Sequence, residues 1–201
     1  MPNSPYTHFV YLEDDERLTF ENFAYFLAAR EILRPYDLVP AFLRTEWSAE
    51  RESFMNTDNV EPVVLMERPF VLAADQIFVN VDNPYCGAFI LDHDLAREYV
   101  VSRSFDQNRS AEVNPFGVRE RAAMGLTFEN PPAPFVYRVV VPVSIATGIP
   151  PHCAWLAHLP NNYAENANEL FGKIKMTNLF SGDFIAATKV RLPAIDSEHK
   201  N

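Results

Sequence analysis

The residues best suited to chemistry lie in one short segment, where His152-Cys153 is followed by His158. Imidazole and thiolate groups are common zinc ligands. In cysteine enzymes the thiolate is the nucleophile and a neighbouring imidazole activates it. A zinc site needs four ligands, or three ligands and an open position, and this spacing matches no closed-site signature. Pro151 and Trp155, on either side of Cys153, favour a packed structural segment. We therefore predict no metal site here.

A second constellation, Asp92-His93-Asp94, places two carboxylates around an imidazole at the end of an apolar run. Strand ends often carry functional residues. However, Asp92 also suits the N-cap of a short helix, and adjacent side chains on a strand or helix point apart. A structural role is therefore the favoured interpretation.

An enzyme built on a cysteine is nevertheless an alternative hypothesis. The other cysteine, Cys86, lies far away in the sequence, and a lone cysteine is more often a core residue than a nucleophile. In the enzyme hypothesis the chemical site consists of His152, Cys153, His158 and His93, brought within hydrogen-bond reach across a sheet.

Glycine and acidic motifs indicate no cofactor. None of the 6 glycines forms a phosphate-binding loop, and no G-x-S-x-G nucleophile elbow is present. The acidic run Glu13–Glu16 lacks the oxygen-ligand spacing of a calcium loop, so we interpret it as a solvated turn. We predict no catalytic residue, no metal and no cofactor.

The composition indicates one globular domain over residues 1–201, with a net charge of −10. This charge disfavours direct nucleic-acid binding, which requires clustered Lys and Arg. Two cysteines form no disulfide framework, and no signal peptide or membrane span is apparent. We therefore expect a soluble chain, made in the cytoplasm, with no membrane partner.

The pattern of apolar residues predicts an α+β fold with a mostly antiparallel sheet and about three helices packed on it. A strand from Phe135 to Thr147 is expected at its centre, with Pro142 marking an edge, a bulge or an end. Phe20 to Arg34 is predicted to be the best helix, capped by Thr19. Its expected apolar face consists of Phe20, Phe23, Ala24, Leu27 and Ala28, and it is widened by Tyr25, Phe26 and Ile32.

Other predicted elements are a hairpin at 77–91, helices at 114–125 and 161–174, and a strand at 184–192. Long connections are expected at 40–60, 103–117 and 148–161. The 16 prolines and only 6 glycines indicate that such connections are stiff.

These three long connections are expected to be extended arms, because they exceed the usual loop length of a compact domain. The apolar residues that they would carry into an interface are Trp47, Phe54, Phe105, Phe116 and Trp155. Arms of this kind become ordered by lying on neighbouring subunits. We therefore expect a non-catalytic subunit of a homo-oligomeric assembly, such as the neck, tail or capsid of a virus or bacteriophage particle. The partners would be copies of the chain and neighbouring proteins.

A small-ligand module with an aromatic-lined cavity is a third hypothesis.

Overall fold

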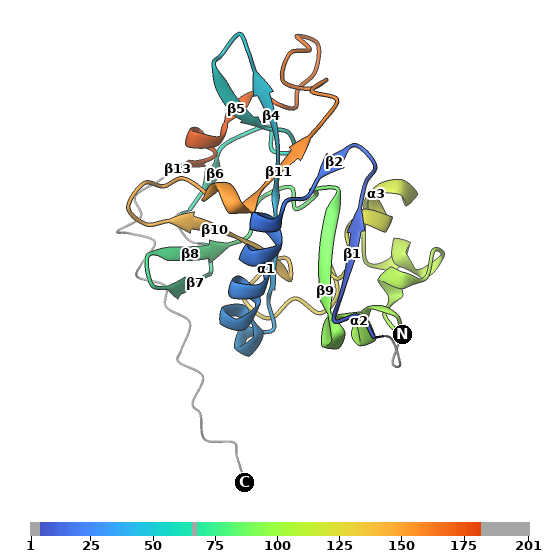
Figure 1. Cartoon of the computed structure of the whole chain (residues 1–201). Helices are drawn as coiled ribbons and strands as arrows, with labels where there is room; N and C mark the ends of the chain where they lie inside the picture. Colours follow the sequence, from blue (N-terminus) through green and yellow to red (C-terminus); the bar gives the residue numbers. More distant parts are fainter. Residues whose placement is uncertain (1–4, 66–67, 182–201) are drawn as a thin grey trace.

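A computed structural model describes residues 5–65 and 68–181, and the fold is α+β (Figure 1). In this part of the chain the α-helices are α1 (Phe20–Leu33), α2 (His93–Tyr99) and α3 (Val118–Ala123). The short 3-10 helices are η1 (Arg34–Tyr36), η2 (Arg103–Phe105), η3 (Arg109–Glu112), η4 (His152–Ala154) and η5 (Met176–Asn178). The strand predicted at 184–192 lies outside the described residues.

The strands form several small sheets instead of one large layer, and their pairings are mostly antiparallel. The largest sheet has the order β12-β5-β4-β11-β2. Its strands are β12 (Ile174–Lys175), β5 (Ser53–Asn56), β4 (Leu43–Ser48), β11 (Trp155–His158) and β2 (Glu16–Arg17). Because β11 runs parallel to β4 and antiparallel to β2, segments far apart in the sequence meet on one surface.

A four-stranded sheet of order β3-β10-β8-β7 contains the strand predicted to be central. Its strands are β3 (Val39–Pro40), β10 (Val139–Ser144), β8 (Gln76–Val79) and β7 (Phe70–Ala73). Strand β10 is shorter than predicted, but Pro142 lies where the prediction allows a proline. The Val140 carbonyl accepts a hydrogen bond from the Ala41 N–H, on the β3 side of the strand. Because backbone groups two residues apart in a strand point the same way, the nitrogen of Pro142 also faces the β3 side. Strand β3 has already ended there, and no ladder hydrogen bond is lost.

Two further pairs of strands complete the sheets. Strand β1 (His8–Leu12) pairs antiparallel with β9 (Ala88–Asp92), and β13 (Phe180–Ser181) pairs parallel with β6 (Val63–Val64). The hairpin predicted at 77–91 is therefore wrong, because β8 and β9 belong to different sheets. The polar turn between them does not close a ladder; it leads the chain from one sheet to the other.

Helix α1 begins and ends close to its predicted limits. Tyr25 and Phe26 are buried as predicted, but the centre of the expected apolar face, with Ala24, Leu27 and Ala28, is exposed. Thr19 forms a capping box with Asn22, as its residue type predicts. Phe20, predicted to face inward, is 83% exposed, whereas Asn22 and Arg30 are buried. The reason is that these two polar residues have specific partners in the core. Asn22 Nδ2 donates to the carbonyls of residues 153 and 155, and Arg30 Nε donates to Asp92.

Two of the expected arms are structural parts of the sheet. Residues 40–60 form β4 and β5 and are mostly buried, and residues 148–161 contain η4 and β11. Residues 103–117 form η2, η3 and the approach to α3. The helix predicted at 161–174 is absent, because this segment folds into turns that end in β12. Burial of both faces of β4 explains why the first segment lacks a simple amphipathic pattern.

Two apolar cores hold the sheets together. One lies under α1 and includes Phe26, Leu33, Phe78, Ile90 and Leu156. The other lies between the four-stranded sheet and the segment that contains η5. Of the three helices, α1 alone covers a sheet broadly, and α2 and α3 pack at the periphery around β9 and η2 (Figure 1). No described helix has both the length and the apolar character required to cross a membrane.

Candidate functional site

The five-stranded sheet brings charged side chains together on one buried face. Glu16 of β2 is directly opposite His158 of β11, so their side chains share a face. Arg44 and Glu46 are two residues apart on β4 and therefore also share a face. Asp58, which follows β5, completes the group. We call these five residues the buried charged cluster, since each has an exposed fraction of 7% or less.

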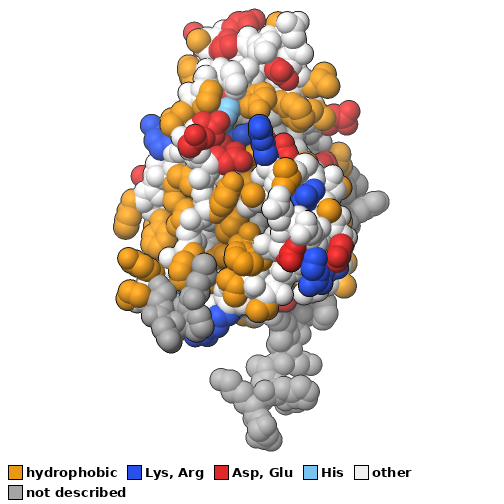
Figure 2. All heavy atoms as spheres, turned by 90° about the vertical axis from the view of Figure 1, so that its right-hand side faces the viewer, with side chains coloured by type: hydrophobic (Ala, Val, Ile, Leu, Met, Phe, Trp, Pro, Cys, Tyr) orange, Lys and Arg blue, Asp and Glu red, His pale blue; other side chains and the backbone are white. Residues whose placement is uncertain are grey.

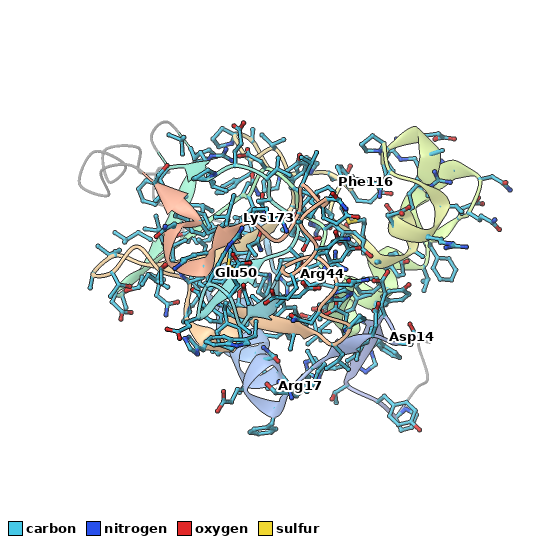
Figure 3. All side chains as sticks on the ribbon, turned by 90° about the horizontal axis from the view of Figure 1, so that it is seen from above. Asp14, Arg17, Arg44, Glu50, Phe116 and Lys173 are labelled. Carbon is cyan, nitrogen blue, oxygen red and sulfur yellow. The ribbon has the colours of Figure 1, made fainter. Side chains whose placement is uncertain are left out.

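Arg44 is held rigidly at the centre of the cluster. It is buried, and it lies near the middle of the molecule as seen from above (Figure 3). Its guanidinium donates to both carboxylate oxygens of Asp58, at 2.6 and 3.2 Å. The rings of Tyr85 and Tyr163 lie 4.9 and 5.4 Å from its Cζ atom. Burial lowers the pKa of Arg44, but Asp58 and Glu16 outweigh burial and raise the pKa above its usual value. Arg44 is therefore charged.

Glu46 fixes the orientation of His158. Its carboxylate lies 2.5 Å from His158 Nδ1 and accepts the backbone N–H groups of residues 162–164. Burial raises the pKa of Glu46, but the hydrogen bonds from His158, Ala164 and Tyr163 together lower it below its usual value. An ionised Glu46 requires Nδ1 to be the donor. The other ring nitrogen, Nε2, then faces Asp15 Oδ2 at 3.3 Å.

Among the described residues, Glu16 alone has buried side-chain oxygens without a hydrogen-bond partner. Its side chain is 0% exposed, and its ion-pair contact is Arg44 Nη1 at 3.5 Å. Burial raises the pKa of Glu16 to about 9, against the effect of Arg44 and with the help of Asp58, Asp15 and Glu13. The interpretation of the acidic run as a solvated turn is therefore wrong for Glu16, because pairing with β11 carries it inside.

The outer side of the cluster opens to solvent through other acidic and phenolic groups. Asp15 has a side chain that is 40% exposed. The Tyr85 hydroxyl donates to Glu13 at 2.7 Å, and burial together with Glu13 raises the pKa of Tyr85. A Cβ atom on Gly87 would lie 3.0 Å from an oxygen of Glu13 and 3.0 Å from one of Glu16, so glycine leaves room for both carboxylates. Acidic groups thus extend from the buried cluster to the surface.

The residues of the enzyme hypothesis are separated in the structure. His158 belongs to the buried charged cluster, whereas His152 is exposed and stacks on Trp155 at 3.9 Å. His93 begins α2 and contacts Phe9. Cys153 is half-buried, and among the described residues no hydrogen bond joins either cysteine to a histidine.

The two thiols are also poor nucleophiles in this environment. Burial raises the pKa of Cys86 to about 11, and burial raises the pKa of Cys153 as well. The thiolate is the reactive form of cysteine, and a raised pKa decreases its population. The geometry therefore gives no support to a cysteine nucleophile.

Three of the five predicted interface residues are brought together on the other face of the five-stranded sheet. Trp47 and Phe54 are cross-strand partners whose ring centroids lie 5.0 Å apart. Phe54 lies 5.5 Å from Trp155, which stacks on His152. We call these four residues the aromatic strip. Trp47 and Phe54 are 46% and 39% exposed, so the strip is an accessible apolar surface.

The remaining two predicted interface residues lie elsewhere. Phe105 is 52% exposed and packs against Tyr99 of α2. Phe116 is half-buried, contacts Phe128 and lies toward the periphery, away from Arg44 (Figure 3). These two residues do not extend the aromatic strip.

A second apolar surface lies over β1, β9 and α2. It contains a hollow of about 400 Å³ lined by residues 8–11 of β1, by Phe89 and Leu91, and by Ala96 and Tyr99. Figure 2 faces the side of the molecule that carries β1, and hydrophobic side chains form a broad area across it. In the described part of the chain, β1 pairs with β9 alone, so its outer edge has no strand partner.

Sequence reasoning missed Arg44, Glu46 and Asp58. A signal for the first two was present, since Arg44, Glu46 and Ser48 alternate with Leu43, Thr45 and Trp47 in a period of two. The position of Asp58 has no comparable local signal, because it depends on where β5 ends.

Comparisons with protein-family models, with curated proteins and with solved structures gave no match.

Proposed function

We propose that this protein is a non-catalytic subunit of a larger homo-oligomeric assembly, and that the aromatic strip binds a second copy of the chain. The observation that carries the proposal is the accessible row of Trp47, Phe54 and Trp155 across three strands. Soluble monomers rarely expose large contiguous apolar patches, and Trp and Tyr are enriched among the residues that contribute most to binding at the centres of interfaces. A second copy supplies apolar cover without any further gene product.

The apolar surface over β1 and β9 supports the same proposal. Between His8 and Leu12 the strand carries no Lys, Arg, Asp, Glu or Pro, the residues that normally protect a free sheet edge. Two different apolar surfaces on one subunit permit head-to-tail contacts, which close into rings or extend into tubes. Rings and tubes are the forms found in the neck and tail of a bacteriophage particle, and this is the kind of assembly that we propose.

The net charge of −10 is compatible with such an assembly. Like-charged copies repel one another except where neutral surfaces meet, so charge favours contact at the apolar surfaces. In a conduit for DNA, an acidic wall would not retain the nucleic acid.

Size-exclusion chromatography with light scattering tests the proposal. We expect the wild-type chain to be oligomeric at micromolar concentration, and Trp47→Ser with Phe54→Ser to shift it toward the monomer. Phe20→Ser is the matched control, because Phe20 is 83% exposed on α1 and belongs to neither surface. A monomeric wild type, or an equal shift in the control, would contradict the proposal. Electron micrographs of the oligomer should show rings or tubes, and irregular aggregates would count against the particle role.

A second candidate function, binding of a small apolar ligand, is favoured by the aromatic-lined hollow over β1 and β9. Its volume of about 400 Å³ lies in the range of small-molecule pockets. Val10→Asp would place a carboxylate in the hollow and should abolish binding of an apolar fluorescent probe. Equal binding by the variant and the wild type would exclude this hollow as the ligand site.

A further inference from the structure

The buried charged cluster and its margin contain more carboxyl groups than cationic side chains. Glu13, Asp15, Glu16, Glu46 and Asp58 bring five carboxyl groups into it or to its margin, and Arg44 is the one permanently positive side chain among them. Arg44 directs its shortest hydrogen bond to Asp58. Arg44 therefore pairs with Asp58 more closely than with Glu16, at 2.6 Å against 3.5 Å.

Glu16 provides an independent indication that something binds there. Both of its oxygens are buried and without a hydrogen-bond partner, although buried polar atoms in native proteins are nearly always satisfied. Its contact with Arg44 Nη1, at 3.5 Å, is longer than a charge-assisted hydrogen bond. The carboxylate is directed toward Asp15 and His158, because these three residues bring ligand atoms within 4.8 Å of one another.

His158 is oriented as a metal-ligating histidine would be. In such sites one ring nitrogen binds the ion and the other donates to a carboxylate that fixes the tautomer. Here Glu46, held by three backbone N–H groups, accepts the hydrogen bond from the Nδ1–H group of His158. Nε2 is left on the side of Asp15, at 3.3 Å from its Oδ2.

From this arrangement we propose that Asp15, Glu16 and His158 bind a divalent transition-metal ion, with Zn²⁺ as the best fit. One imidazole and two carboxylates are typical zinc ligands, whereas Mg²⁺ and Ca²⁺ prefer all-oxygen sites. In a tetrahedral site with zinc bonds of about 2.0–2.2 Å, two ligand atoms lie about 3.3–3.6 Å apart. Asp15 Oδ2 and His158 Nε2, at 3.3 Å, already match this spacing, and the Glu16 oxygen, within 4.8 Å of both, would have to move closer by up to about 1 Å. Solvent reaches the site past Asp15, whose side chain is 40% exposed.

The bound ion would tie the turn before β2 to β11. At present the Leu159 N–H donates to the Asp15 carbonyl at 2.8 Å, and the pairing of β2 with β11 covers only two residues of each strand. Three protein ligands leave a fourth position open to water or to another donor. The proposal is independent of self-association, because the site lies on the face of the sheet opposite the aromatic strip.

Zinc titration of the untagged, chelator-treated full chain tests the proposal, with competition against a chromogenic chelator as the measurement. We expect one Zn²⁺ per chain and a rise in melting temperature. Asp15→Asn and Glu16→Gln should each weaken binding at least about 100-fold, and Glu46→Gln, which disturbs the tautomer, about 10- to 100-fold. Asp14→Asn is the matched control, because Asp14 is exposed and one residue away, and it should bind like the wild type.

Three outcomes would overturn the proposal. The first is the absence of stoichiometric Zn²⁺ binding by the wild-type chain. The second is undiminished binding by Glu16→Gln, which would place the zinc on exposed histidines such as His152. The third is an equal loss in Asp14→Asn. Asp15→Asn changes a half-exposed side chain and so keeps the test valid if a buried variant does not fold.

Discussion

Replacement of Asp92 by Asn should destabilise the protein strongly, because Asp92 joins three elements with a single carboxylate. Its Oδ2 accepts from Arg30 of α1 at 2.8 Å, and its Oδ1 accepts the Leu95 N–H at the start of α2 at 2.9 Å. Arg34 lies 3.5 Å away. Asn at this position retains the N-cap, since Asn and Asp are equally good N-cap residues. However, its neutral amide removes the negative charge that faces Arg30.

The magnitude follows from burial of the pair, whose side chains are 8% and 12% exposed. Removing one partner of a buried ion pair costs about 3–5 kcal/mol. Arg30 keeps its hydrogen bond to the Leu38 carbonyl, so we expect about 2–4 kcal/mol for Asp92→Asn. For a chain of this size that loss lowers the melting temperature by about 6–12 °C. Urea unfolding at pH 7, followed by circular dichroism, measures it.

The effect should also depend on pH with a defined sign. Burial raises the pKa of Asp92, but the Leu95 N–H and Arg30 outweigh burial and lower it below its usual value. A lowered folded-state pKa gives stability that is complete above the unfolded pKa of about 3.9 and is lost as the pH falls through the folded value. The difference between wild type and Asp92→Asn should therefore be full at pH 7 and decrease below about pH 4.

Two controls separate the pair from a general effect of the substitution. Asp94→Asn changes a carboxylate with a 64% exposed side chain in the same helix and should leave stability within experimental error of the wild type. In the double variant Arg30→Met with Asp92→Asn, the total loss should be smaller than the sum of the single losses. A wild-type-like Asp92→Asn, or a difference that is constant from pH 7 to pH 3, would refute the reasoning.

Three other substitutions or modifications give sharp expectations. Gly87→Ala should destabilise by about 1–3 kcal/mol in urea unfolding, because φ is +71° and the new Cβ meets oxygens of Glu13 and Glu16 at 3.0 Å; an unchanged midpoint would show that both carboxylates move freely. Asn22→Ala should cost about 2–4 kcal/mol, because two carbonyls near β11 lose their donor, and a loss below about 0.5 kcal/mol would contradict the anchoring role. Cys86 should react with a thiol reagent only at the rate of unfolding, because it is 4% exposed with a pKa of about 11; fast labelling in the native state would be inconsistent with its burial.

The limits of α1 were predictable from sequence, but its orientation was not. Thr19 and Pro35 mark the helix because capping and the missing proline N–H act locally. The buried side depends on partners more than a hundred residues away, such as the carbonyls of residues 153 and 155 that Asn22 binds. A polar residue with a dedicated buried partner thus turns a helix whose aromatic residues cover most of its circumference, and Phe20 is left outside.

The strands were predicted best where one face is apolar and the other is not. Val139–Ser144 has this pattern and was found, although the expected strand was too long. Residues 40–60 were interpreted as an arm because β4 is buried on both faces with charged residues on one of them, a pattern that hydrophobic periodicity does not detect. The segment 161–174 has helical spacing but folds into turns. In these turns Lys173 Nζ donates to the carbonyls of residues 163, 164 and 166, which in a helix would accept from backbone N–H groups.

Strand β4 contributes residues both to the buried charged cluster and to the aromatic strip, the two features to which we assign roles. Along β4, Arg44 and Glu46 enter the buried charged cluster, and Trp47 enters the aromatic strip on the opposite face. Because side chains alternate, a one-residue shift of β4 against β11 would exchange the two sets and bury Trp47 among carboxylates. Arg44 and Glu46, through their specific partners Asp58 and His158, therefore fix the register that exposes the strip. The assembly surface that we propose therefore depends on the buried charges on the opposite face of β4.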